Sequence, residues 1–237
     1  MLFRSVMPTS AAYAKGSELL RSFADKVSPV PLGIDLAPFR EPSKNALAHA
    51  ARFREWFGSP LWLCVGRLIY YKGLYIAFES LREIPGRLMV IGTGPLEASL
   101  KRRAANLGVA DRVVWYGYAS ADELVGAYLA ATALWFPSTV RSEAFGLVQV
   151  EAMASGCPVV NTAIPGSGVP WVCRHGREGL TVPVNDAPSL TAAANRLLGQ
   201  SGLRDRLAAA GRERAGAEFD HRVMAERSLA IYREVLG

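Results

Sequence analysis

Two carboxylates, Glu143 and Glu151, lie on either side of a predicted helix start, with seven residues between them. Glu143 comes just before the helix, and Glu151 lies about one turn inside it. Between them, the backbone amides of Phe145, Gly146 and Leu147 have no partner a turn earlier, and such free amides attract phosphate. Carboxylates beside an anion site can accept hydrogen bonds from vicinal hydroxyls. The pattern suits a nucleoside diphosphate sugar; in the plainer interpretation, the carboxylates only complement the helix dipole.

Two cations, Arg67 and Lys72, follow the first predicted strand. Gly66 ends that strand and lets the backbone turn sharply. Arginine offers phosphate a planar fork, and lysine supplies a compact charge. Together they would neutralise a diphosphate and stabilise it as it departs with growing negative charge. The alternative is two solvated charges at a junction between a strand and a helix.

Two further loops could approach a nucleoside. Gly92 and Gly94 follow the second predicted strand, and their conformational freedom would let the backbone come close to a ribose or phosphate. A plain turn explains the same glycines equally well. Tyr118 follows the third strand, where it could stack on a purine or simply be an aromatic side chain at the rim.

Strands and helices that alternate along the chain must position these residues. Short apolar runs that end at glycine or proline predict six strands, at 60–65, 87–91, 112–116, 133–136, 158–161 and 179–183. Helical spacing predicts helices at 44–57, 72–83, 95–107, 121–130, 146–155, 186–199, 201–217 and 220–236, with Asp186 and Asp220 as N-caps. The alternation indicates an α/β fold, a doubly wound Rossmann-like parallel sheet of about six strands. In such sheets ligands bind beyond the carboxyl ends of the strands, where all these motifs lie.

Composition narrows the class of protein. The chain has 237 residues, half of them hydrophobic and a fifth charged, which is typical of a globular protein. No apolar run approaches the ~18 residues that a membrane span needs, and the first residues make no convincing signal peptide. Cys64, Cys157 and Cys173 are odd in number and widely spaced, so we expect reduced thiols in a cytosolic protein. The net charge of +6 fits an anionic substrate or membrane surface better than nucleic acid, because no basic run is interleaved with aromatics.

The segment that holds both carboxylates resembles glycosyltransferase family 4, a group of retaining enzymes with the GT-B fold. The family signature E-A-F-G-L-x-x-x-E-A-M-A-x-G-x-P-V-V matches residues 143–160 almost throughout. Residues 66–73 likewise resemble the G-R-x-x-x-x-K-G element of the family. The resemblance implies that Arg67 and Lys72 hold the donor diphosphate, that Glu143 orients the sugar and that Glu151 binds the ribose. It also implies catalysis without a metal or other cofactor, and the chain has no Asp-x-Asp pair.

The loop that follows the fifth predicted strand also resembles the family. Residues 163–171 form a Gly- and Pro-rich loop, and the resemblance places Gly166 and Ser167 near the donor. We expect Trp171 to pack in the protein core instead of serving as a platform for a sugar ring.

The resemblance covers about residues 27–237, the donor-binding half of a GT-B enzyme. It implies three parts: residues 1–26 as a residual helix from the acceptor domain, 27–219 as the nucleotide-sugar-binding domain, and 220–237 as a crossing helix. Residues 10–25 are predicted to form one helix, capped by Thr9 or Ser10. An N-terminal acceptor domain of roughly one to two hundred residues would be missing.

Three functions follow as expectations. The first is a retaining glycosyltransferase that transfers a hexose to a glycan or lipid-linked acceptor, as in lipopolysaccharide or other polysaccharide biosynthesis. GDP-mannose is the first expected donor and a UDP-hexose the second. The second is a nucleotide-sugar-binding module, inactive until a separate acceptor-binding domain docks. The third is another GT-B-like enzyme, an epimerase or phosphorylase, which lacks support from the residues present. We expect a cytoplasmic protein, with peripheral contact at the inner membrane as a minor alternative.

Overall fold

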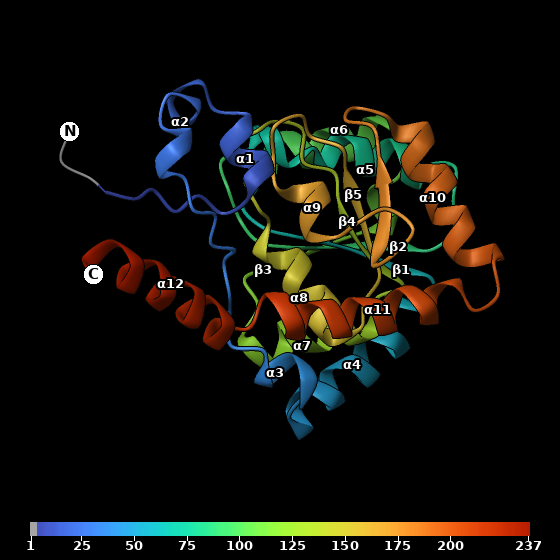
Figure 1. The fold of residues 1–237 in the computed structure, drawn as a ribbon. Helices are drawn as coiled ribbons and strands as arrows, with labels where there is room; N and C mark the ends of the chain where they lie inside the picture. The colour runs from blue at the N-terminus through green and yellow to red at the C-terminus, as the bar shows by residue number, and fades with distance from the viewer. Residues whose placement is uncertain (1–3) are drawn as a thin grey trace.

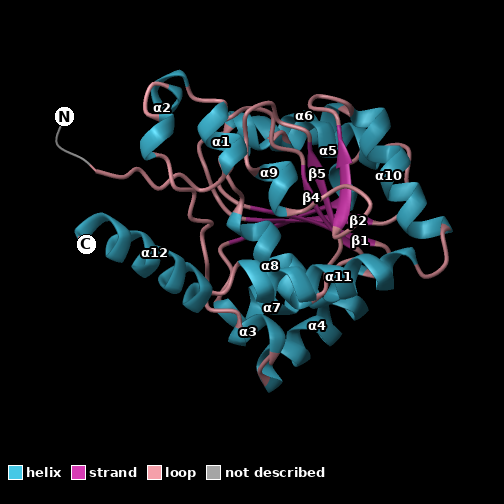
Figure 2. Ribbon diagram, in the orientation of Figure 1, coloured by secondary structure: helices cyan, strands magenta, loops and turns pink. Residues whose placement is uncertain are grey.

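A computed structural model describes residues 4–237, which form a six-stranded sheet with helices on both faces (Figure 1, Figure 2). The strands are β1 (Leu61–Val65), β2 (Arg87–Ile91), β3 (Val113–Gly117), β4 (Ala133–Phe136), β5 (Val159–Thr162) and β6 (Gly179–Val182). Their order is β3-β2-β1-β4-β5-β6, and every pairing is parallel. The order reverses between β1 and β4, which opens a crevice at the carboxyl ends of these strands. The predicted doubly wound Rossmann-like sheet is confirmed.

Helices cover the sheet in two layers. The helices of the described residues, not all of which lie on the sheet, are α1 (Ala11–Lys15), α2 (Glu18–Arg21), α3 (Ala37–Arg40), α4 (Lys44–Phe57), α5 (Leu74–Leu81), α6 (Glu97–Asn106), α7 (Ala121–Ala130), α8 (Leu147–Ser155), α9 (Val169–Val172), α10 (Ala187–Gly199), α11 (Leu203–Glu218) and α12 (His221–Leu236). Residues of α5, α6 and α10 pack in the core on one face, and residues of α4, α7, α8 and α9 pack on the other. Figure 1 shows α5, α6 and α10 on one side of the strands and α4, α7 and α8 on the other. Both faces of the sheet are therefore covered by helices and shielded from solvent, as is typical of parallel sheets.

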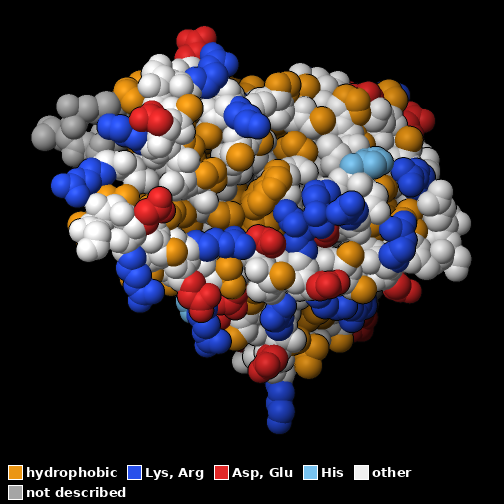
Figure 3. Space-filling model, viewed as in Figure 1, with side chains coloured by type: hydrophobic (Ala, Val, Ile, Leu, Met, Phe, Trp, Pro, Cys, Tyr) orange, Lys and Arg blue, Asp and Glu red, His pale blue; other side chains and the backbone are white. Residues whose placement is uncertain are grey.

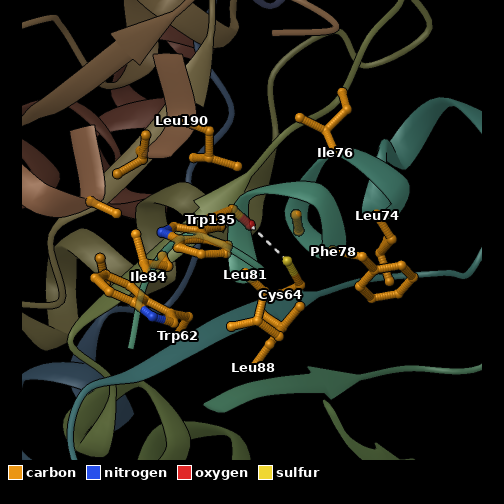
Figure 4. Close-up of a cluster of buried hydrophobic side chains, with 14 of the residues drawn as sticks. Trp62, Cys64, Leu74, Ile76, Phe78, Leu81, Ile84, Leu88, Trp135 and Leu190 are labelled. Atoms are coloured by element: carbon orange, nitrogen blue, oxygen red, sulfur yellow. Dashed lines mark hydrogen bonds between the residues drawn. The ribbon is translucent and has the colours of Figure 1, made fainter. Parts of the chain in front are cut away.

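Large aromatic side chains fill the core on the α5 face. Trp62 and Trp135, on adjacent strands, stack with ring centroids 4.7 Å apart (Figure 4). Trp62 Nε1 donates to Pro85 O, and Cys64 Sγ donates to Trp135 O. Burial raises the pKa of the Cys64 thiol to about 12, and the three cysteines are all buried and unpaired. They act as packing residues.

The N-terminal segment differs from the single helix predicted for residues 10–25. The structure instead has α1, α2 and a 3-10 turn at Ala24–Lys26. The break falls at Gly16, where a Cβ would come within 2.6 Å of the Gly166 backbone. Ser17 then accepts a hydrogen bond from Leu20 N and begins a new helix. The predicted cap at Ser10 is confirmed, because its Oγ accepts from Tyr13 N.

The C-terminal helix α12 extends away from the sheet (Figure 1). Asp220 caps it as predicted, accepting from Arg222 N at 2.9 Å, but no residue of α12 is buried. On the face shown in Figure 3, hydrophobic side chains gather between this helix and the N-terminal segment. Within residues 4–237, no helix is long and apolar enough to cross a membrane.

Candidate functional site at the carboxyl ends of the strands

The loops after β1 and β4 are fixed to each other through their backbones. Thr139 N donates to Tyr71 O at 2.8 Å. Gly73 has φ +65°, and a Cβ there would lie 2.0 Å from Pro137 O. Only glycine fits this close approach in this conformation. Lys72 was predicted to lie within a helix. It lies instead in a 3-10 turn that ends at Gly73, just before the α5 helix.

The loop after β2 packs on the loop after β1 in the same way. Leu68 N donates to Thr93 O at 3.0 Å, and Leu68 O accepts from Leu96 N at 3.2 Å. A Cβ at Gly92 would lie 2.1 Å from Gly66 O, and one at Gly94 would lie 2.5 Å from Leu68 O. Gly92 and Gly94 thus have a packing reason to be glycine, and their contact with a ligand stays a prediction.

Lys72 and Glu143 meet at the centre of the site. Lys72 Nζ lies 2.5 Å from Glu143 Oε2, and Ser138 Oγ donates to the same oxygen at 3.1 Å. The side chains of Lys72 and Glu143 are only 14% and 10% exposed, so each charge depends on the other. Lys72 Nζ also lies 5.1 Å from the centre of the Phe136 ring. The sequence predicted both residues at one site, and the structure brings them into direct contact.

Arg67 lies near this pair but remains exposed to solvent. Its side chain makes no ion pair or hydrogen bond with the part of the chain that the structure describes. Its charge acts on the hydroxyl of Tyr71, whose pKa is raised by burial and by Glu143 and lowered in part by Arg67. Arg67 and Glu143 are thus both close enough to this hydroxyl to affect its pKa, and within residues 4–237 the Arg67 side chain has no ion-pair or hydrogen-bond partner.

The loop before α8 presents the amides that the sequence singled out. Within residues 4–237, the amide nitrogens of Phe145, Gly146 and Leu147 donate no hydrogen bond to protein atoms. Gly146 is left-handed, with φ +78°, and the helix begins at Leu147, one residue later than predicted. The Phe145 ring is buried against Trp171 and Phe219, so only its backbone can face a ligand. This arrangement can bind an anion.

Glu151 occupies a different environment from Glu143. It accepts a hydrogen bond from Tyr128 Oη on α7 at 2.7 Å. Burial raises the pKa of Glu151, and the bond from Tyr128 offsets part of that rise. Among the described residues, Glu151 makes no hydrogen bond or ion pair with Glu143 or Lys72. The structure therefore brings Lys72 and Glu143 into direct contact, whereas Glu151 bonds to Tyr128 of α7, and its contact with a ligand stays a prediction.

Tyr118 lies at the rim of the sheet, directly after β3, and its side chain is 87% exposed. No aromatic ring of residues 4–237 is in contact with its own. The exposed ring is accessible for stacking, and its contact with a base stays a prediction.

Three polar residues of the site were not predicted in their observed roles. Ser138 donates to Glu143, and its position after a strand end was the one available signal. Tyr128 is fully buried on a helix, and nothing in its sequence context predicts its bond to Glu151. Ser167, expected near the donor, is buried and donates to Glu143 O at 2.5 Å, so it supports the loop. Trp171 packs on Phe219 as predicted.

Acidic, histidine and cysteine side chains do not gather into a possible metal site. Across residues 4–237, no three of them lie close enough to hold an ion together. Catalysis without a metal stays a prediction, and Lys72 and Arg67 are the positive charges that the sequence singled out for this site.

Comparison with known proteins identifies a family and a fold. The family model described as "Glycosyl transferases group 1" matches residues 52–214. D-rhamnosyltransferase WbpZ of Pseudomonas aeruginosa is 33% identical over 178 residues, which cover 75% of this chain and 45% of that protein. A second relative, from Mycolicibacterium smegmatis, is a GDP-mannose-dependent alpha-(1-6)-phosphatidylinositol monomannoside mannosyltransferase. It is 32% identical over 196 residues, which cover 77% of this chain and 50% of the relative. The chain spans about half the length of most of the curated relatives that it matches.

A solved structure supports the fold independently. Anabaena Alr3699/HepE, crystallised in complex with UDP, superposes with a TM-score of 0.87 at 20% sequence identity. The match covers 98% of this chain and 64% of that one. At this identity the likeness establishes the fold alone.

Proposed function

The chain belongs to the glycosyl transferases group 1 family, and we propose that it binds the donor of a retaining hexosyltransferase that uses a nucleoside diphosphate sugar. The observation that carries this proposal is the Lys72–Glu143 contact beside the free amides of residues 145–147. One cation, one acceptor of hydroxyl protons and a row of amide donors lie together there. A phosphorylated sugar could use all three, because its phosphates accept from the cation and the amides and its hydroxyls donate to the carboxylate.

The cations would stabilise the leaving group. When the bond between the anomeric carbon and the phosphate oxygen breaks, its electron pair goes to the diphosphate. Lys72, the exposed Arg67 and the amides of residues 145–147 would then meet the growing negative charge. An acceptor hydroxyl that arrives on the same face would form the new bond and give its proton to the departing phosphate oxygen, which preserves the anomeric configuration.

Glu143 would orient the sugar instead of attacking it. Its Oε2 already accepts hydrogen bonds from Lys72 Nζ and Ser138 Oγ, which leaves Oε1 to accept from sugar hydroxyls. A carboxylate that is held in place by two donors is a poor candidate for a covalent nucleophile, although paired carboxylates elsewhere act in this way. Glu143 would also set the position of the Lys72 ammonium beneath the diphosphate.

Glu151 would bind the ribose hydroxyls. Among the described residues it has one hydrogen-bond donor, Tyr128, and burial disfavours its charge. Two vicinal hydroxyls would supply the donors that the protein does not. The test compares a ribonucleoside diphosphate with its 2′,3′-dideoxy analogue. Wild type should prefer the ribonucleotide, and Glu151→Ala should lose that preference; equal discrimination by the variant would contradict the role.

We propose GDP-mannose as the donor, with a UDP-hexose as the alternative. The mycobacterial relative is named for GDP-mannose, which favours the first, whereas the fold neighbour was crystallised with UDP. A thermal-shift panel of GDP, UDP and ADP distinguishes them. The base that raises the melting temperature most identifies the nucleotide, and no shift with any of the three would contradict nucleotide binding.

The acceptor would be a glycan or a lipid-linked glycan, bound by a part of the enzyme beyond this chain. The chain spans about half of its relatives, which favours a donor-binding role for the part described here. The three buried free cysteines and the net charge of +6 fit a cytoplasmic enzyme that works near an anionic inner-membrane surface.

A second function is a binding module that transfers nothing until an acceptor-binding domain docks. The same share of relative length favours it. Calorimetry with nucleoside diphosphates and an assay of donor hydrolysis, each with and without the N-terminal half of a relative, separate the two functions. Turnover by the chain alone would exclude the module, and binding without turnover in both arms would exclude the enzyme.

A further inference from the structure

In the loop before α8, three successive backbone carbonyls accept hydrogen bonds from buried groups of the protein. The carbonyls of residues 143–145 accept, in order, from Ser167 Oγ at 2.5 Å, from Gly168 N at 2.9 Å and from Gln149 Nε2 at 2.9 Å. In a planar trans peptide, the next N–H points opposite to the carbonyl. The amides of residues 144–146 are thereby directed away from these donors. Successive amides that point the same way form an anion-binding concavity.

The third of these bonds depends on a side chain whose own orientation is determined. Asn161 Nδ2 donates to Cys173 O at 2.9 Å and to Val169 O at 3.2 Å, both of which can only accept. Its NH₂ group must therefore face them, and Gln149 Oε1 at 2.8 Å is its third acceptor, so one of its two N–H groups is shared between two oxygens. With its oxygen taken by Asn161, Gln149 has only its NH₂ group to offer Phe145 O.

Gly146 makes this restraint necessary. With φ +78° and ψ 73°, it lies in a region that glycine leaves and enters readily. Rotation of the peptide between Phe145 and Gly146 would turn the carbonyl outward and the amide inward. An anion would then meet an oxygen in place of a donor. The bond from Gln149, a fully buried residue, opposes that rotation.

We propose that Gln149, with its side-chain amide oriented by Asn161, is a positioning residue that holds the Gly146 amide toward the diphosphate of the donor. The inference rests on the proposed function, because it concerns the same anion site. A purely structural role would make Gln149 one more satisfied polar group in the core. The two roles differ in which ligands they affect.

The experiment uses Gln149→Met, which keeps the length of the side chain and removes the donor. Calorimetry measures GDP and UDP against guanosine and uridine. The variant should lose about tenfold in affinity for the diphosphate that wild type binds, as one charge-assisted hydrogen bond is worth about 1.4 kcal/mol or more. Affinity for the nucleoside should stay within about twofold. The matched control is Ser80→Ala, which removes a buried side-chain bond to Ala187 O on the other face of the sheet and should change neither.

A second variant, Gln149→Glu, gives a pH signature and covers the case in which Gln149→Met does not fold. An ionised carboxylate has no proton for Phe145 O, whereas a protonated one can donate again while it accepts from Asn161. Diphosphate affinity relative to wild type should therefore recover as the pH falls. A structural role would give no such recovery.

The outcomes separate the two proposals. Wild type that binds neither GDP nor UDP overturns the proposed GDP- or UDP-sugar donor and this inference with it. Wild type that binds a diphosphate, with Gln149→Met unchanged or equally weakened for nucleoside and diphosphate, overturns the positioning role alone. Loss confined to the diphosphate, together with the pH recovery of Gln149→Glu, supports it.

Discussion

The two carboxylates at the start of α8 have the same chemistry and different surroundings. Glu143 meets Lys72 and Ser138, so its charge has a counter-ion and a second donor. Glu151, in the helix itself, accepts from Tyr128 alone among the described residues, and burial raises its pKa. The partners therefore decide whether a buried carboxylate is stable as an anion. Glu143 thus has a counter-ion and a second donor from the protein, whereas Glu151 has one donor, and under the proposed function the ribose hydroxyls would supply the others.

The largest expected effect comes from the Glu143 end. Lys72→Ala leaves the Glu143 charge without a counter-ion in a mostly buried place, so the free energy of unfolding should fall by about 3 kcal/mol or more. Denaturant unfolding measures this loss. The double variant Lys72→Ala/Glu143→Gln should recover much of it, because the unpaired charge is gone. A single variant as stable as wild type would mean that the pair contributes nothing.

A smaller loss is expected at the Glu151 end. Tyr128→Phe removes the donor to Glu151 and should lower the free energy of unfolding at neutral pH by about 2 kcal/mol, the worth of a bond to a charged group. Thermal and denaturant unfolding measure it. Because the bond lowers the pKa of Glu151, the variant should also lose more stability at neutral than at acidic pH. An equal loss of stability at neutral and at acidic pH would show that the Tyr128 hydroxyl contributes only to packing.

Glu151→Gln tests the sign of the charge penalty. The pKa of Glu151 is raised above its ordinary value of 4.5, so the neutral form favours folding. The stability it contributes is full below pH 4.5 and is lost as the pH rises through the raised pKa. Glutamine keeps the acceptor for Tyr128 and never ionises. The stability of the variant relative to wild type should therefore increase from acidic to neutral pH, and a flat or falling difference contradicts the assignment.

The smallest effect on stability belongs to Arg67. Arg67→Ala should change the free energy of unfolding by less than about 0.5 kcal/mol, because the side chain is exposed and has no bonded partner among the described residues. The affinity of the Arg67→Ala variant for a nucleoside diphosphate should nonetheless fall by about tenfold, because one charge-assisted contact with phosphate is lost. Arg87→Ala, an exposed arginine where β2 begins at the opposite edge of the sheet, is the control for net charge. Equal losses in both variants would point to long-range attraction only.

Local patterns predicted most of the fold. The apolar runs placed β2 and β4 at their observed bounds, and the helix at 121–130 begins and ends as predicted. Ser120 and Glu123 form a capping box there, which is a signal within a few residues. The helix expected at 10–25 was wrong because its break depends on contact with Gly166, far along the chain.

Contacts between distant residues limited the prediction of the site. Lys72 and Glu143 were both expected there, but their bond joins positions 71 apart in the sequence. Glu151 was expected beside them, and its bond to Tyr128 depends on how α7 packs against α8, which no local pattern encodes. The glycines at 92 and 94 were recognised as special, whereas their partners on the β1 loop were visible only in three dimensions.

The interlocked loops have a consequence for protein engineering. Four glycines, Gly66, Gly73, Gly92 and Gly94, lie in the loops that contact one another at this edge of the sheet. A Cβ at Gly73, Gly92 or Gly94 would overlap the neighbouring backbone, and Gly66 has a φ of +139° that other residues rarely adopt. A combinatorial library that seeks a new donor preference should hold these four codons constant. Diversity belongs at outward-facing positions such as Tyr118, where many side chains can be sampled without the scaffold collapsing.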